Sequence, residues 1–183
     1  MSALRSSVSF ALLALLAFQA TANDHAAPGH RNSPLVGLVR EATDRFWNVE
    51  TAIAEGYAAG PCVSGPNGGA MGVHYINGAL VGDGTLDPAQ PEALMYEPKP
   101  NGQLRLVGVE YIVLAGDWDA ANPGTPPVLE GHLLNFVGSP NRYAIPAFYE
   151  LHVWAWRKNP SGTFADWNPN VTCDAQTSGA MAH

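Results

Sequence analysis

The segment LRLVGVEYIVLA (104–115) is the most apolar run of the chain after residue 22. Valine, isoleucine, leucine and tyrosine dominate it, and the β-branched and aromatic residues among them favour a strand. Pro100-Asn101-Gly102, just before it, is a hairpin-turn signal. Similar apolar runs lie between turn residues at 71–76, 93–97, 128–136 and 148–156. The pattern predicts about five antiparallel strands.

One helix is predicted ahead of these strands. Ser33 and Pro34 suit a helix start, because serine can cap free N–H groups and proline is tolerated in the first turn. From Leu35 to Tyr57, apolar residues recur at spacings of three and four, which marks one buried stripe. The expected fold is therefore α+β, with one N-terminal amphipathic helix packed on a curled antiparallel sheet or partial barrel.

The ends of the chain differ from its centre in composition. Residues 1–22 combine one arginine, an apolar stretch and a small-residue end, which is typical of a secretory signal peptide. That stretch is shorter than a membrane-spanning helix requires. We expect a flexible arm at 23–32, a single globular domain at 33–173 and a disordered tail at 174–183. The protein is thus predicted to be exported, to the periplasm or the outside of the cell, without a membrane span.

The chain is acidic and contains two cysteines. Its 9 Lys and Arg against 16 Asp and Glu give a net charge of −7, and the basic residues are scattered. This balance argues against nucleic-acid partners and against anionic lipid surfaces. In an oxidising compartment two cysteines usually pair, so a Cys62–Cys173 disulfide is predicted. A metal-binding or reactive thiol is the alternative.

Three ionisable side chains interrupt the most apolar predicted strands. Glu110 is the only acid in the run at 104–115. Glu150 and His152 stand two positions apart in YELHVWAW (149–156), so they project from the same face of a strand. Because an unpaired buried charge is very costly, each of these groups needs a hydrogen-bond partner, an ion pair or a bound cation.

Histidines in two further strands extend this set to a predicted transition-metal site. Neutral imidazole together with carboxylate suits Zn, Mn, Fe or Cu, and the sequence does not distinguish among them. The ion could support catalysis, with Glu150 or Tyr75 carrying a proton. Alternatively, each histidine is a satisfied core residue and Glu110 pairs with Arg105 or Arg142. The predicted metal ligands are His74, Glu110, His132 and His152.

Two other hypotheses place the function elsewhere. A small-molecule binding module without metal would use Trp154, Trp156 and the loop 116–127, which contains Trp118, to enclose a ligand. A copper- or nickel-handling protein would use the new N-terminus left by cleavage after Ala22. There Asn23, Asp24 and His25 would supply four nitrogens in a square plane, the geometry that Cu(II) and Ni(II) prefer.

Three segments of the chain, GVHYIN (72–77), LVGVEYIV (106–113) and LHVWAWRKNPSGTFADWNP (151–169), resemble a family of small exported bacterial proteins of uncharacterised function. The resemblance extends from about Cys62 to Cys173 and transfers no activity. It implies that the family's signature segments contain His74, Glu110, His152 and Trp154.

Overall fold

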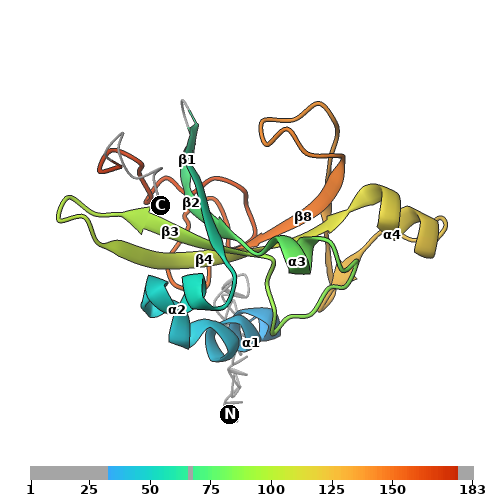
Figure 1. The fold of residues 1–183 in the computed structure, drawn as a ribbon, viewed down its shortest axis with the longest axis horizontal. Helices are drawn as coiled ribbons and strands as arrows, with labels where there is room; N and C mark the ends of the chain where they lie inside the picture. The colour runs from blue at the N-terminus through green and yellow to red at the C-terminus, as the bar shows by residue number, and fades with distance from the viewer. Residues whose placement is uncertain (1–32, 66–67, 177–183) are drawn as a thin grey trace, which may run out of the picture.

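The computed structural model describes residues 33–65 and 68–176 (Figure 1). Six strands form one antiparallel sheet in the order β1-β2-β3-β4-β8-β7, and β5 and β6 form a separate hairpin. The elements are α1 (Pro34–Thr43), the 3-10 helix η2 (Asp44–Trp47), α2 (Val49–Ala54), β1 (Ala58–Gly65), β2 (Gly69–Ile76), α3 (Gly78–Val81), β3 (Ala93–Pro98), β4 (Leu104–Leu114), α4 (Ala115–Ala121), β5 (Val128–Leu129), β6 (His132–Leu133), β7 (Asn135–Val137) and β8 (Phe148–Val153).

The predicted α+β class, with helical structure at the N-terminal end packed on a curled antiparallel sheet, is confirmed. The helix itself is broken, although the sequence predicted one continuous element. Helix α1 ends at Thr43, and a new N-cap forms at Asn48, whose side chain accepts a hydrogen bond from the backbone N–H of Glu50. An asparagine stabilises a helix start better than a helix interior, so it favours a new helix over continuation of the old one.

The two faces of the sheet have different partners. Helices α1 and α2 cover one face (Figure 1), where Tyr96, Tyr111 and Leu151 pack with Leu35 and Phe46 in the largest hydrophobic cluster. Side chains alternate along a strand, so the residues between these strand positions point to the other face. The loop between β7 and β8 rises on that other side of the sheet (Figure 1).

Three segments differ from the sequence prediction. Strand β1 was not predicted, because its sequence AAGPCVSG lacks the apolar pattern of a strand. The first of two irregularities in its pairing with β2 falls at Gly60 and Pro61. The run at 128–136 is not one strand but β5, β6 and the start of β7. The predicted loop at 116–127 begins as helix α4, which extends to Ala121.

The disulfide prediction is confirmed: Cys62 in β1 is bonded to Cys173, 111 positions later in the sequence. Next to it, the Gln176 side chain accepts a hydrogen bond from the Cys62 N–H, so residues 174–176 are packed against β1. Every helix within the described ranges is too short or too polar to reach across a bilayer. The predicted signal peptide, the arm with Asn23, Asp24 and His25, and positions 177–183 lie outside the described residues.

Candidate metal centre

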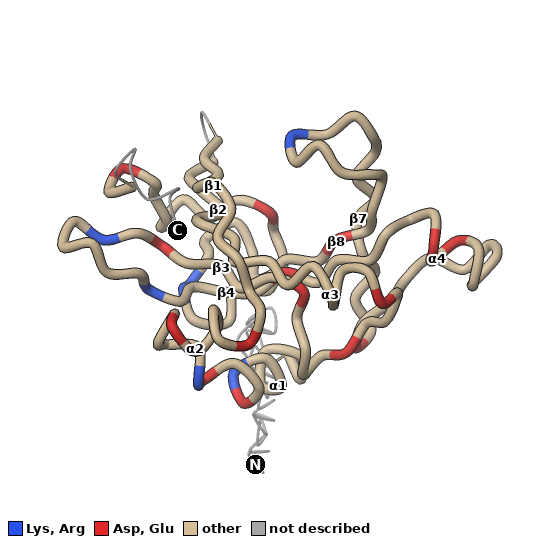
Figure 2. Tube along the Cα trace, in the orientation of Figure 1, with Lys and Arg blue, Asp and Glu red and all other residues tan. Residues whose placement is uncertain are grey.

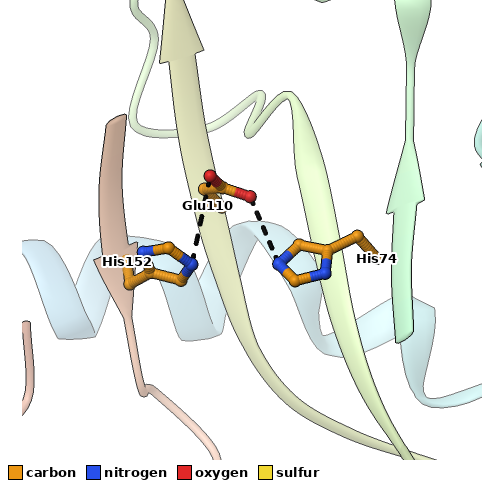
Figure 3. Close-up of side chains that lie close together, drawn as sticks. All are labelled: His74, Glu110 and His152. Atoms are coloured by element: carbon orange, nitrogen blue, oxygen red, sulfur yellow. Dashed lines mark ion pairs between the residues drawn. The ribbon is translucent and has the colours of Figure 1, made fainter. Parts of the chain in front are cut away.

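Register places two of the candidate ligands directly opposite each other. Glu110 on β4 pairs with His152 on β8 and, on its other side, with Ala93 on β3. His74 lies one strand further along, on β2, where it pairs with Met95 of β3. Because Ala93 carries only a methyl group, the longer side chains of β2 and β4 can meet above β3. Figure 3 shows Glu110 between the two imidazoles.

The nitrogen and oxygen atoms of these three side chains that could bind a metal are close together. The Nε2 atom of His74 lies 3.3 Å from Oε2 of Glu110, and Nε2 of His152 lies 3.9 Å from Oε1 of the same carboxylate. The two imidazole rings are nearly perpendicular, at 85°, with centroids 6.0 Å apart. Glu110 therefore faces one histidine with each oxygen.

The cluster is buried and incompletely satisfied. The side chains of His74 and Glu110 are 3% exposed and that of His152 is 0% exposed. Both ring nitrogens of His74, both ring nitrogens of His152 and Oε1 of Glu110 make no hydrogen bond to any residue in the described ranges. Three of these atoms, Nε2 of His74, Oε1 of Glu110 and Nε2 of His152, lie between the two rings (Figure 3). Buried polar atoms are nearly always paired with protein, water or an ion, so three orphaned atoms that face one point mark a binding site.

Burial and mutual charge shift the pKa values of all three groups. Burial lowers the pKa of His74 to about 3, so its imidazole is neutral with a free lone pair. Burial raises the pKa of Glu110, and the neighbouring Glu150 raises it further against the opposing effect of His152. Burial alone would lower the pKa of His152, but the carboxylates of Glu110 and Asp166 raise it above its usual value. The cluster therefore retains a proton near neutral pH.

The second nitrogen of His152 faces another carboxylate. Its Nδ1 lies 3.6 Å from Oδ1 of Asp166, whose side chain is 39% exposed. Asp166, Glu150 and His152 also lie within mutual ligand distance of one another. An imidazole that donates its far N–H to a carboxylate presents its other nitrogen as a lone pair, an arrangement common around protein metal sites. At 3.6 Å Asp166 makes a charge contact rather than a hydrogen bond with Nδ1, and its negative charge favours the tautomer of His152 whose lone pair faces Glu110.

Sequence reasoning did not single out Asp166 as a site residue. It lies in the segment 157–169 beyond β8, where no periodicity indicates which side chains turn inward. Its tripeptide Ala165-Asp166-Trp167 belongs to the segment that carries the family resemblance, and that was the one available signal.

One donor separation, the 3.3 Å between His74 and Glu110, matches a single transition-metal ion, whereas the 3.9 Å between His152 and Glu110 would have to shorten by about half an ångström on binding. Ligands at bonds of about 2.0–2.1 Å in tetrahedral or octahedral geometry lie roughly 3–3.4 Å apart. One donor atom each from His74, Glu110 and His152 can be chosen so that all lie within 4.8 Å of one another, and the closest pair is 3.3 Å apart. Two histidines and one carboxylate are the ligand set of many zinc hydrolases and of non-haem iron enzymes.

Three predicted site residues lie apart from this cluster. Tyr75 projects from the opposite face of β2 and packs against Tyr96, at a ring-centroid distance of 5.1 Å. The His132 ring lies 3.9 Å from that of Phe164, and its Nε2 is 3.3 Å from the Ser33 hydroxyl. Trp118, on α4, donates its indole N–H to the carbonyl of Thr125. The alternative partners of Glu110, Arg105 and Arg142, form no ion pair with it.

Trp154 and Trp156, predicted to enclose a ligand together with the loop 116–127, lie apart from the metal-ligand cluster. Strand β8 ends at Val153, so its alternation stops before Trp156, which donates its N–H to Thr43 and packs edge-on against Trp47. Trp154 donates to the carbonyl of Ala165. Both tryptophans line a cavity of about 660 Å³ beside α1 that includes none of the three candidate ligands.

A different cavity opens onto His74 and Glu110. Its volume is about 380 Å³. Tyr143, from the loop between β7 and β8, stands at this cavity with its ring centroid 6.4 Å from that of His74. An ion held by the cluster would therefore have one side open to a chamber that a small molecule could enter.

No family model matches the chain, and no characterised protein or solved structure is significantly similar to it. The resemblance to small exported bacterial proteins stays a prediction. Inference about function therefore rests on the geometry of the site.

Proposed function

We propose that this protein is an exported metal-binding protein whose single transition-metal ion is held by His74, Glu110 and His152. The observation that carries the proposal is the convergence of three buried donor atoms, none of which has a hydrogen-bond partner in the described ranges. Asp166 supports it, because it faces the nitrogen of His152 that an ion would leave free. Export is supported by the Cys62–Cys173 disulfide, since such bonds persist in oxidising compartments.

The cavity beside the cluster favours a reactive rather than a purely structural ion. Structural zinc sites are closed by four protein ligands, whereas catalytic sites keep a position open. Here the three ligands leave room on the side of the 380 Å³ cavity. A divalent ion in such a position acts as a Lewis acid or lowers the pKa of a bound water. Glu150, buried next to Glu110, is suited to accept or return a proton.

The test is metal content by elemental analysis of untagged protein, after reconstitution with Zn, Mn, Fe or Cu and removal of free ion. A His25→Ala background removes the predicted amino-terminal copper motif from the count. We expect about one equivalent of a transition metal per chain, and less than about a tenth of an equivalent in His74→Ala, Glu110→Gln and His152→Ala.

His132→Ala is the matched control, because that histidine lies outside the cluster. It should bind the same amount of metal as the parent protein. Far-ultraviolet circular dichroism of each variant checks that the sheet is intact. A parent protein that stays below a tenth of an equivalent after reconstitution contradicts the proposal and leaves the cavity as a binding site without metal.

A further inference from the structure

The cavity beside the metal-ligand cluster is lined mainly by apolar side chains. His74 and Glu110 form its polar end. At about 380 Å³ it is at the small end of the range for ligand pockets. It suits a compact molecule with an apolar body better than a sugar or a nucleotide. The apolar lining comes from Pro61, Ile76, Val81, Ile112, Ile145 and Phe148.

The loop between β7 and β8 brings one cation to this cavity. Figure 2 shows a basic residue near the tip of that loop, and Arg142 is the only Lys or Arg between the two strands. The side chain of Asn141 donates to the carbonyls of Gly138 and Ile145, which fixes the shape of the loop. Tyr143 packs against Phe148 at a ring-centroid distance of 6.0 Å.

The charge of Arg142 helps to lower the pKa of Asp166, but only from a distance. Its guanidinium lies over the ring of Trp167, 5.0 Å from the ring centroid, and forms no ion pair with a described carboxylate. Arg142 lines the cavity together with the apolar residues. A guanidinium beside an apolar chamber is well suited to bind a carboxylate through two parallel hydrogen bonds.

We propose that this cavity binds a small apolar monocarboxylate, with the carboxylate on Arg142 and the apolar body against Ile112 and Phe148. The inference rests on the proposed function, because a bound divalent ion offsets the negative charge of Glu110, which lines the same cavity as Arg142. The guanidinium of Arg142 recognises the carboxylate of the ligand, and the apolar wall of the cavity recognises its hydrocarbon body.

The experiment uses three probes of graded chemistry: phenylacetate, its neutral analogue phenylacetamide, and acetate. Each is titrated calorimetrically into the metal-loaded protein. We expect phenylacetate to bind at least about tenfold more tightly than phenylacetamide, because one charge-assisted hydrogen bond contributes about this difference in affinity. Acetate should bind more weakly than phenylacetate. Arg142→Gln should abolish the preference for phenylacetate over phenylacetamide without changing the metal content.

Val81→Phe is the second variant, because Val81 lines the cavity from α3 and is neither Arg142 nor one of the proposed metal ligands. It should weaken phenylacetate binding and leave metal content intact. Equal affinity for phenylacetate and phenylacetamide, no binding of either, or unchanged phenylacetate binding in Arg142→Gln overturns the inference.

The same titrations on protein stripped with chelator separate this inference from the proposed function. If the parent protein fails the metal-content test but still shows a preference for phenylacetate that depends on Arg142, the carboxylate site is supported and only the metal site is contradicted. Full metal content without any such preference contradicts only the carboxylate site.

Discussion

Glu110 and His152 are cross-strand partners on β4 and β8, and the Oε1 of the glutamate lies 3.9 Å from the Nε2 of the histidine. Their approach is therefore a property of strand register rather than of a flexible loop. A slip of one residue would turn one of the two side chains to the face that α1 and α2 cover. The core packing that fixes the register also fixes the site.

Metal affinity should rise with pH. The pKa values of Glu110 and His152 are both raised, the former by burial and the latter by the two carboxylates that outweigh its burial. An ion must displace the proton that they hold, so affinity should increase by about tenfold per pH unit for each proton released. The rise should continue past 6.5, the ordinary pKa of histidine. Competition with a chelator between pH 6 and 8 measures it; a flat profile contradicts the shared proton.

Asp166→Asn should weaken metal binding without abolishing it. The asparagine can present its N–H₂ group to Nδ1 of His152, which would favour the tautomer with a proton on Nε2, the nitrogen facing Glu110. Loss of such an orienting carboxylate costs about 10- to 100-fold in affinity. Chelator competition gives the affinity, and Asp166→Glu should recover part of it. Asp174→Asn removes the same charge from an exposed position nearby and should have no effect.

Gly108→Ala should destabilise the protein and disturb the cluster. A Cβ atom at position 108 would lie 2.6 Å from the carbonyl oxygen of Val153 and 2.7 Å from the Cε of Met95, so β4 and β8 would have to separate. Overpacking of this kind costs about 1–3 kcal/mol. Urea unfolding measures the change. Gly37→Ala, in α1 with no atom near its added methyl group, is the control and should leave stability equal or improved.

Glu92→Gln should make stability less dependent on pH. Burial raises the pKa of Glu92 to about 8 from an ordinary 4.5, although the hydrogen bond from the N–H of Ile112 opposes the shift. The folded state therefore binds this proton more tightly than the unfolded state. Its stabilising contribution is complete below about pH 4.5 and is lost as pH rises through about 8.

Melting temperatures of parent and Glu92→Gln proteins across this range measure the contribution of Glu92. The parent should lose stability with rising pH more steeply than the variant. The exposed Glu41→Gln, a control of the same chemistry, should follow the parent curve. Parallel curves for parent and Glu92→Gln would show that Glu92 ionises normally.

Sequence patterning was sufficient for the fold class because local signals agreed with the final packing. Apolar runs between turn residues located β2, β3, β4 and β8, which are the four strands that carry or separate the candidate ligands. Strand β1 was not predicted, because its pairing with β2 and the disulfide hold it in place rather than a side-chain pattern of its own. The interruption of the N-terminal helix depends on the single N-cap at Asn48, and the periodicity of apolar residues over the whole segment does not reveal it.

The candidate site was also predictable in part, because some of its residues stand out within their own strands. A carboxylate or imidazole inside an apolar strand is costly, and that cost identified His74, Glu110 and His152 from sequence alone. His132 lies in a two-residue strand of the separate hairpin, so it carried the same signal without the same burial. Tyr143 and Asp166 come from loops, and only tertiary packing brings them to the cluster.

The groups that meet at the cluster are widely dispersed in sequence, since His74 and Asp166 are separated by most of the folded chain. No short peptide of this protein contains two of the three proposed ligands. A nascent segment thus offers a cation only one of the three proposed ligands, and selection among ions at this site has to await a nearly finished polypeptide. If the protein is exported as proposed and folds only after export, the metal supply outside the compartment of synthesis would determine which element it carries.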